Sequence, residues 1–280
     1  MQEKWSRFRK NHKARRRLAL ASRILLEIGA EVGYTTSKAR SKMNLHLLMI
    51  IECGVFLVLG IVLGNAAVYV FNHVPGKWLC DYGQEPDEEL LHPTCQRVKS
   101  TPWKFVFSGA FVVIGIYMGT KEPFYALPAV FAMWMLLEMS IADIKYMIVP
   151  DQFIIGLLVC GLGILPTTED LMMNVYGAAA AFVVLIAIAG LSKLIYKQSA
   201  IGGADIKLFT ALGLLTGIYG VAVIFVLSTL TSAGHFVVLL ILKKAKLRDR
   251  RPMVPYIAGC AAFYMVFLRD LLYNGFDIAI

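Results

Sequence analysis

Long runs of apolar residues recur along the chain after residue 43, and they constrain its fold more than any other feature. Of the 280 residues, 58% are hydrophobic and 17% are charged, whereas soluble domains are roughly half apolar and a quarter charged. Runs of about 17 to 25 apolar residues are long enough to cross a bilayer as helices. The sequence therefore predicts an all-α, polytopic membrane protein with about 7–8 transmembrane helices, and it argues against a soluble core.

Short polar stretches separate the apolar runs, and the glycines of 217–220 divide one long run into two. Residues 43–280 are therefore expected to form one membrane-embedded domain. The expected spans are residues 45–71, 103–118, 124–142, 153–165, 172–195, 208–215, a seventh that ends near 242, and 253–272.

Residues 1–42 differ from the rest and form a basic N-terminal appendage. They contain 12 Lys/Arg and 3 Asp/Glu, so they alone account for the net charge of +9. Such a segment suits an amphipathic helix on an anionic lipid surface. The lipid bilayer is thus the expected partner of this segment. Nucleic-acid binding is not expected, because nothing else in the chain suits it.

The basic loops predict which ends of the spans share a face. Short loops rich in Lys and Arg stay in the cytoplasm, and the most basic one is 243–251. Counting back by pairs of spans places 193–207, 143–151 and the loop 72–102 on that same cytoplasmic face. The same parity puts the basic appendage on the opposite face, against its charge, and the sequence leaves that conflict open.

These cytoplasmic segments include Asp143, at the end of the third span, and Asp205, before the sixth. Charged residues beside membrane spans are costly and usually mark a functional site. Two adjacent carboxylates share one proton, so that one activates water while the other polarises a carbonyl, as in aspartic proteases. Gly202 and Gly203 would let an extended substrate backbone approach Asp205 closely.

Other interpretations of the same residues remain open. Asp143 can pair with Lys145 or Lys207, Asp205 can cap a helix, and both can belong to the ion or proton pathway of a membrane transporter. Lys207 is interpreted either as orienting Asp205 or contacting the substrate backbone, or as an interfacial lysine that extends its ammonium group to water. Glu138, in the third span, is expected to be a packed and hydrogen-bonded carboxyl group.

Two motifs resemble those of the type IV prepilin peptidases, a family of membrane aspartic proteases with a Gly-x-Gly-Asp motif. The first runs from Asp143 to Asp151 and ends in Ile-Val-Pro-Asp; the second is Gly-Gly-Ala-Asp-Ile-Lys-Leu at 202–208. The stretches 59–65 and 251–256 resemble the first and last spans of family members. The resemblance covers about residues 43–272.

The resemblance implies that Asp143 and Asp205 are the catalytic pair and that Asp151 accompanies the first motif. It implies no cofactor. Its substrates would be prepilins or pseudopilins, whose basic leader is cut at the cytoplasmic face of the plasma (inner) membrane. One departure is Ala204, which stands where the family has the second glycine of the motif. It leaves open a catalytically impaired, pilin-binding homologue.

A second departure concerns the loop 72–102, which is shorter than in many bacterial members. Those members carry two Cys-x-x-Cys pairs linked to N-methylation of the trimmed pilin, whereas this loop has only Cys80 and Cys95. Methyltransferase activity and a metal site are therefore not expected. The candidate zinc ligands are Cys80, His92 and Cys95, with His73 as a fourth. The sequence does not identify the pilin, its cleavage sequence or the oligomeric state.

Overall fold

A computed structural model describes residues 45–80, 85–86, 90, 96–168, 170–197, 201–244, 246 and 251–271. The chain divides into two compact units, 1–51 and 52–280. The basic appendage at 1–42 lies outside the described residues. All helices that carry the aspartates belong to the second unit.

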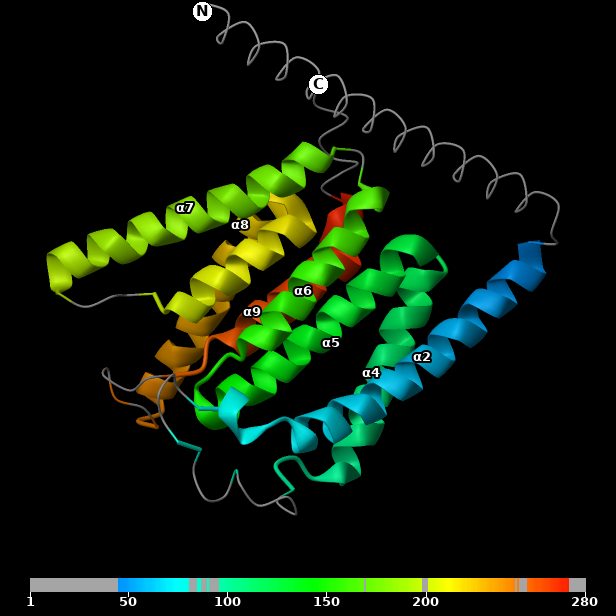
Figure 1. The fold of residues 1–280 in the computed structure, drawn as a ribbon, viewed down its shortest axis with the longest axis horizontal. Helices are drawn as coiled ribbons and strands as arrows, with labels where there is room; N and C mark the ends of the chain where they lie inside the picture. Colours follow the sequence, from blue (N-terminus) through cyan, green and yellow to red (C-terminus); the bar gives the residue numbers. More distant parts are fainter. Residues whose placement is uncertain are drawn as a thin grey trace, which may run out of the picture. The chain divides into compact units, whose positions relative to one another are not determined.

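The described secondary structure is entirely helical, which confirms the predicted all-α class (Figure 1). Short 3-10 turns and one π-helical segment extend or connect the longer helices. In chain order the elements are α2 (Leu45–His73), η1 (Gly76–Trp78), α4 (Ser100–Gly119), α5 (Pro123–Tyr146), α6 (Asp151–Ile164), η2 (Leu165–Thr167), α7 (Leu171–Tyr196), α8 (Gly203–Ile241), α9 (Val254–Phe263) and η3 (Tyr264–Leu268).

Among the described residues, 6 helices are long and apolar enough to cross a membrane, and Asp151–Thr167 is a shorter apolar helix. The chain is thus a multi-pass membrane protein. The difference from eight expected spans comes partly from α8, whose 39 residues hold both the sixth and the seventh.

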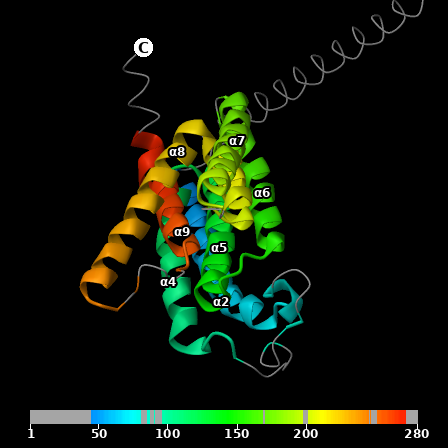
Figure 2. The ribbon, with the colours of Figure 1, turned by 90° about the vertical axis from the view of Figure 1, so that its left-hand side faces the viewer.

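Helix α8 is a hairpin rather than one straight rod. Gly217 interrupts it with φ 72° and ψ 179°, a conformation that glycine adopts without steric cost. Phe209 and Phe225, equally far from Gly217 in sequence, bring their ring centroids to 5.4 Å; in a continuous helix, 16 residues would separate them by about 24 Å. Figures 1 and 2 show the two arms running in opposite directions, so residues 203 and 241 lie at one end.

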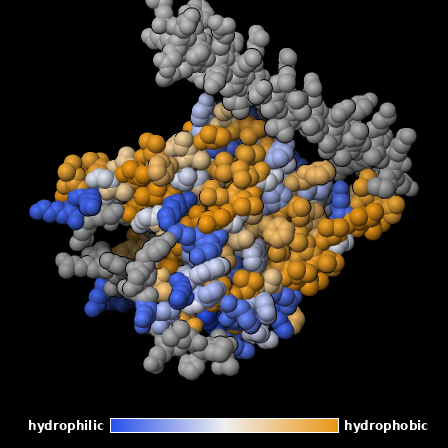
Figure 3. Space-filling model, in the orientation of Figure 1, coloured by the Kyte–Doolittle hydropathy of each residue, from blue (hydrophilic) through white to orange (hydrophobic). Residues whose placement is uncertain are grey.

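The outer surface is apolar, as expected for helices that face lipid. Large hydrophobic side chains are exposed along α2 and α7, among them Val58 (59%), Val183 (62%) and Leu194 (81%). Figure 3 shows hydrophobic residues across a broad band of one face. In water such a contiguous patch would promote association, whereas in a bilayer it faces acyl chains.

Glycines allow some helices to approach at backbone distance. A Cβ atom on Gly64 of α2 would lie 2.1 Å from the α4 backbone, and one on Gly177 of α7 would lie 2.6 Å from the carbonyl oxygen of Gly213. Small residues at such contacts are typical of membrane helix pairs. Gly60 and Gly64 thus serve the close packing that the sequence predicted for the first span, but Gly54 has no neighbour within 4 Å.

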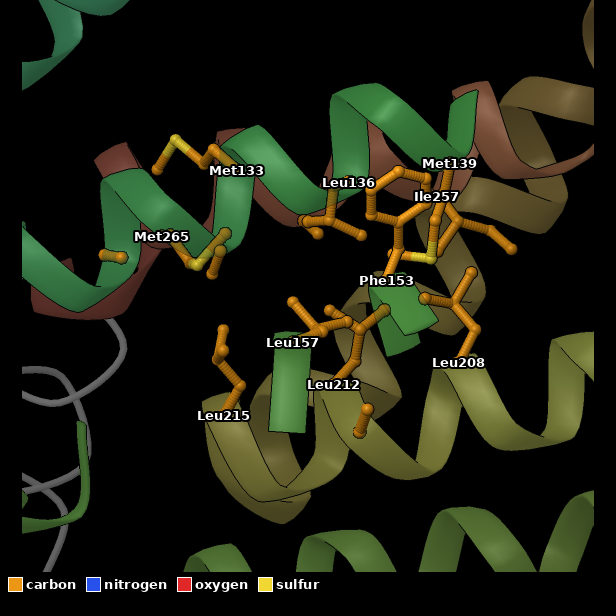
Figure 4. Close-up of a cluster of buried hydrophobic side chains, with 14 of the residues drawn as sticks. Met133, Leu136, Met139, Phe153, Leu157, Leu208, Leu212, Leu215, Ile257 and Met265 are labelled. Atoms are coloured by element: carbon orange, nitrogen blue, oxygen red, sulfur yellow. The ribbon is translucent and has the colours of Figure 1, made fainter. Parts of the chain in front are cut away.

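The buried core lies where α5, α6, α8 and α9 converge, and Figure 4 shows their side chains interlocking. Each helix contributes large apolar residues at positions three or four apart, so one face of each is buried. The labelled residues are Met133, Leu136, Met139, Phe153, Leu157, Leu208, Leu212, Leu215, Ile257 and Met265.

Arg97 joins the loop after α2 to the end of the bundle that carries the aspartates. Its side chain is buried and donates hydrogen bonds to the carbonyl oxygens of Phe71 and Val74, at the end of α2. Its own carbonyl oxygen accepts a hydrogen bond from Lys145 of α5. The described part of the loop therefore lies at the same end as the last turn of α5, as the span parity predicted.

Candidate active site

Asp143 lies in the last turns of α5, and α9 supplies its partners. Its side chain is buried (7% exposed for the residue), and its Oδ2 accepts a hydrogen bond from the backbone N–H of Val254 at 2.8 Å. The first N–H groups of a helix have no partner within it and favour an anion. The start of α9 therefore orients Asp143 across 111 residues of sequence.

Asp205 lies in the first turn of α8 and folds back over the start of its own helix. Its Oδ2 lies close to Gly202, the residue that precedes the helix. The N-cap of α8 is Gly202, so the interpretation of Asp205 as the N-cap was wrong.

The two glycines beside Asp205 have different surroundings. A Cβ atom on Gly202 would lie 3.3 Å from Oδ2 of Asp205, so any side chain there would crowd the carboxylate. A Cβ atom on Gly203 would meet nothing within 4 Å. Gly202 therefore has a local reason to be glycine, whereas Gly203 leaves open space next to the carboxylate.

The bundle places the carboxyl group of Asp205 within electrostatic range of Asp143. They come from different helices and are 62 positions apart in sequence. Both are partly screened from water by the surrounding helices. A pair of interacting carboxyl groups titrates as a unit, and that arrangement suits activation of a water molecule against a carbonyl.

The lysines do not pair with Asp143 as the alternative interpretation supposed. Lys145 donates to the carbonyl oxygen of Arg97. Lys207 donates to both oxygens of Asp151, each at 2.9 Å. Both predicted pairings with Asp143 were wrong for the same reason: each ammonium group hydrogen-bonds a residue outside its own helix, Arg97 for Lys145 and Asp151 for Lys207. Lys207 and Asp151 thus join the start of α8 to the start of α6.

Ala204 has an ordinary backbone conformation. It is the second residue of α8, and the non-helical backbone within that helix is confined to Gly217. Its methyl group therefore imposes no backbone strain on the motif.

Glu138 differs from its prediction. It is fully buried in α5 (0% exposed), and neither carboxyl oxygen has a hydrogen-bond partner among the residues that the structure describes. The expected packing is therefore observed, but the expected hydrogen bond is not. An unpaired buried polar group is costly, so Glu138 weakens this part of the core.

The described residues contain no group of three His, Cys, Asp or Glu side chains arranged to hold a metal. Of the candidate zinc ligands, Cys80 donates weakly to the carbonyl oxygen of Lys77. His92 and Cys95 lie outside the described residues.

The sequence did not predict that the start of α9 contacts Asp143. Its proline at the second helical position and the proline at 252 are helix-start signals, present in the stretch 251–256. They mark where free N–H groups occur, but they do not say which carboxylate meets them. Arg97 was also missed, because a lone arginine in a polar loop gives no sign of burial.

Comparison with known proteins relates the region from α5 to α8 to a peptidase family. Residues 130–237 match the model of the type IV leader peptidase family. The chain is 27% identical over 151 residues to the prepilin leader peptidase/N-methyltransferase of Bacillus subtilis (strain 168), which covers 53% of this chain and 58% of the relative. It is 28% identical over 151 residues to the protein of that name from Aeromonas hydrophila, with 53% and 52% covered.

A third relative of the same name, from Xanthomonas campestris, is 31% identical over 138 residues, with 46% of each chain covered. The chain thus spans about half the length of the curated relatives it matches. No solved structure matches it. Residues 130–237, which contain Asp143, Asp151 and Asp205, are thus a region of the type IV leader peptidase family.

Proposed function

We propose that this protein is a membrane aspartic endopeptidase that cleaves the basic leader of prepilins or pseudopilins, with Asp143 and Asp205 as its catalytic pair. The observation that carries the proposal is that these two carboxyl groups, from α5 and α8, lie within electrostatic range of each other. Family membership and the names of the relatives point to the same substrate class.

The mechanism follows from a carboxyl pair that holds one proton. The ionised carboxylate removes a proton from water, and the oxygen attacks the carbonyl carbon of the scissile peptide bond. The protonated carboxyl group hydrogen-bonds the carbonyl oxygen and stabilises the charge that develops there. Proton transfer to the leaving nitrogen then breaks the C–N bond, giving one carboxyl and one amino terminus.

The surrounding residues have supporting roles in this proposal. The N–H group of Val254 orients Asp143, and the absence of a side chain at Gly202 leaves room for the carboxyl group of Asp205. Open space beside Gly203 leaves room for an extended substrate backbone. Lys207 and Asp151 set the distance between the helix starts.

The site is proposed to face the cytoplasm. The exposed basic residues Lys243, Lys244 and Arg251 lie in the loop between α8 and α9, at the aspartate end, and short basic loops remain on the cytoplasmic side. Methylation of the trimmed pilin is not part of the proposal. Mass spectrometry of the mature amino terminus tests this directly, because replacing one N–H hydrogen by a methyl group adds the mass of one CH2 unit.

The deciding experiment is co-expression with a prepilin substrate, with leader removal followed by immunoblotting and mass spectrometry. Asp143→Asn and Asp205→Asn are each expected to lower cleavage by about 10³-fold or more, because catalytic groups act as a unit. Asp170→Asn is the matched control. Asp170 caps α7 at the other end of α6, and Asn caps helices equally well.

Cleavage that persists in both variants would exclude the aspartic mechanism. Wild-type protein that binds a prepilin without cutting it would instead identify a pilin-binding homologue. Solute flux that the same two substitutions abolish, without any cleavage by the wild type, would identify a transporter.

A further inference from the structure

A pocket of about 200 Å³ lies between α7 and the two arms of α8. Figure 1 shows α7 running beside α8. Ala180 and Val184 of α7 form part of one wall, and the others include Phe209 of the first arm of α8 and Phe225 of the second. The surface of the pocket is entirely apolar, and none of its described lining residues has a polar side chain. Most ligand sites place a few polar groups among apolar ones, so this pocket suits an occupant that needs no hydrogen bond.

The pocket opens on the side of the molecule that faces lipid. Val184 and Val226 belong to its lining and are 52% and 53% exposed. Phe209 and Ala181, which also line it, are only 1% and 8% exposed and therefore lie deeper. The neighbouring residue of α7, Val183, is 62% exposed on the apolar outer surface. The medium at the mouth of the pocket is therefore hydrocarbon rather than water.

Neither water nor empty space accounts well for such a pocket. A buried water needs two to four polar partners, and the described lining offers no polar side chain. An empty void would leave the lining atoms without packing partners on one side. Since the pocket adjoins the bilayer, acyl chains are the apolar material available to fill it.

The volume of the pocket distinguishes an acyl chain from a helix. A helix about 10 Å wide, with its pitch of about 5.4 Å, occupies about 420 Å³ per turn. That is twice the volume of the pocket, so neither a transmembrane helix of another protein nor one of a second copy of this chain fits inside. An apolar cavity of about 150 Å³ binds benzene, which has six carbons, so 200 Å³ holds about eight carbons of an alkyl chain.

We propose that this pocket binds one acyl chain of a membrane phospholipid, inserted between α7 and the two arms of α8. Packing drives the binding, because lipid and protein side chains are equally apolar here. The chain contacts Phe209, whose ring centroid lies 5.4 Å from that of Phe225. Phe209 follows Asp205 by four residues, about 6 Å along the helix, so the bound chain packs beside the arm that carries Asp205. The binding itself does not depend on the proposed peptidase function.

The test uses the full chain in vesicles of dioleoylphosphatidylcholine that contain a small fraction of a phosphatidylcholine with a diazirine in the middle of one acyl chain. Irradiation links the probe to the side chains it touches, and mass spectrometry locates the links. Phe209 is the diagnostic residue, because it is buried from the surrounding lipid and lines the pocket. Val183 is the internal reference, because it is exposed to lipid and is not part of the lining. The wild type is expected to be labelled at both.

Ala180→Phe and Ala222→Phe each add a phenyl ring to the pocket, from α7 and from α8 respectively. Each should lower the labelling of Phe209 about tenfold, because six added carbons take most of a space for about eight. Labelling of Val183 should stay unchanged. Ala179→Phe is the matched control, since Ala179 is an exposed residue of the same helix outside the lining; it should leave the labelling of both residues unchanged. Two variants from opposite walls, with thermal unfolding of each, separate a filled pocket from a damaged fold.

Absence of labelling at Phe209 in the wild type would exclude the acyl chain. Equal labelling of Phe209 in the wild type and in both filled variants would exclude it as well, since the probe would then reach Phe209 by another route. If an added prepilin abolishes the labelling of Phe209 but not of Val183, the pocket belongs to an apolar part of that protein instead. Cleavage is not measured, so the result for the acyl chain stands even where the proposed peptidase function fails.

Discussion

The Lys207–Asp151 ion pair allows a quantitative test of how the aspartate site is held together. Lys207 lies two residues after Asp205, and Asp151 begins α6 just beyond the turn that follows Asp143. The pair is bidentate at 2.9 Å, but the side chains are 52% and 32% exposed. We predict that this bridge contributes little to stability and much to the geometry of the site.

The two magnitudes can be worked out separately. Partly exposed ion pairs stabilise a protein by about 0.2–1 kcal/mol. Loss of the pair should therefore lower Tm by no more than about 4 °C in a chain of this size. By contrast, moving a catalytic group by about 1 Å can cost 10²-fold in rate. Lys207→Asp and Asp151→Lys should each reduce kcat for leader cleavage by about 10- to 100-fold, with only a small change in Tm.

The double variant, which restores opposite charges in exchanged positions, should recover about tenfold of the lost rate. Recovery is incomplete because lysine at the first position of α6 opposes the helix dipole at a cost of about 0.3–1 kcal/mol. Cleavage of a prepilin and thermal unfolding are measured on the same detergent-solubilised samples. The pair Lys121–Asp270, 3.5 Å apart and similarly exposed at the far end of α5, is the control; its exchange should leave kcat unchanged.

Additive rate losses in the double variant would refute the reasoning, because they would show that the two residues act independently. A loss of stability above about 2 kcal/mol in either single variant would also refute it, since the rate loss would then reflect a damaged fold.

Three further predictions concern stability and local space. Gly177→Ala should lower the unfolding free energy by about 1–3 kcal/mol, because its methyl group would lie 2.5 Å from the α8 backbone. Gly190→Ala is the control in the same helix: its methyl group would meet nothing within 4 Å, so it should not destabilise the protein. Thermal unfolding in detergent measures both variants. Glu138→Leu should raise the unfolding free energy by about 1–3 kcal/mol without loss of cleavage, because an unpaired buried carboxyl group is removed. Loss of cleavage in a variant that still folds would contradict this prediction. Gly202→Ala should reduce cleavage more than Gly203→Ala, because only the first methyl group meets Asp205; equal rates would disprove it.

Much of the fold could be predicted because membrane helices are encoded by local composition. A run of about twenty apolar residues is a helix in a bilayer whatever its neighbours are. The reversal at Gly217 was also local, since only a few residues can turn a chain so sharply. Span parity then placed the two aspartates at one end without any knowledge of the packing.

The partners of the site residues could not be predicted, because they depend on how helices distant in sequence pack. The N–H of Val254 reaches Asp143 across 111 residues, and nothing near Asp143 in sequence indicates it. Lys207 is close to Asp205 in sequence, yet its ammonium group lies on Asp151 of α6. A charge pattern identifies which residues need a partner, whereas only the packed helices determine which partner each one meets.

For Ala204, the sequence motif and the backbone conformation lead to different expectations. From the motif alone, a methyl group in place of the second glycine suggests impaired catalysis. The backbone there is right-handed helix, which alanine favours over glycine by up to about 1 kcal/mol. Ala204→Gly should therefore lower stability slightly and leave kcat/KM for leader cleavage within about threefold. A gain of tenfold or more would show instead that the methyl group obstructs the substrate, because backbone strain offers no other route to such a gain.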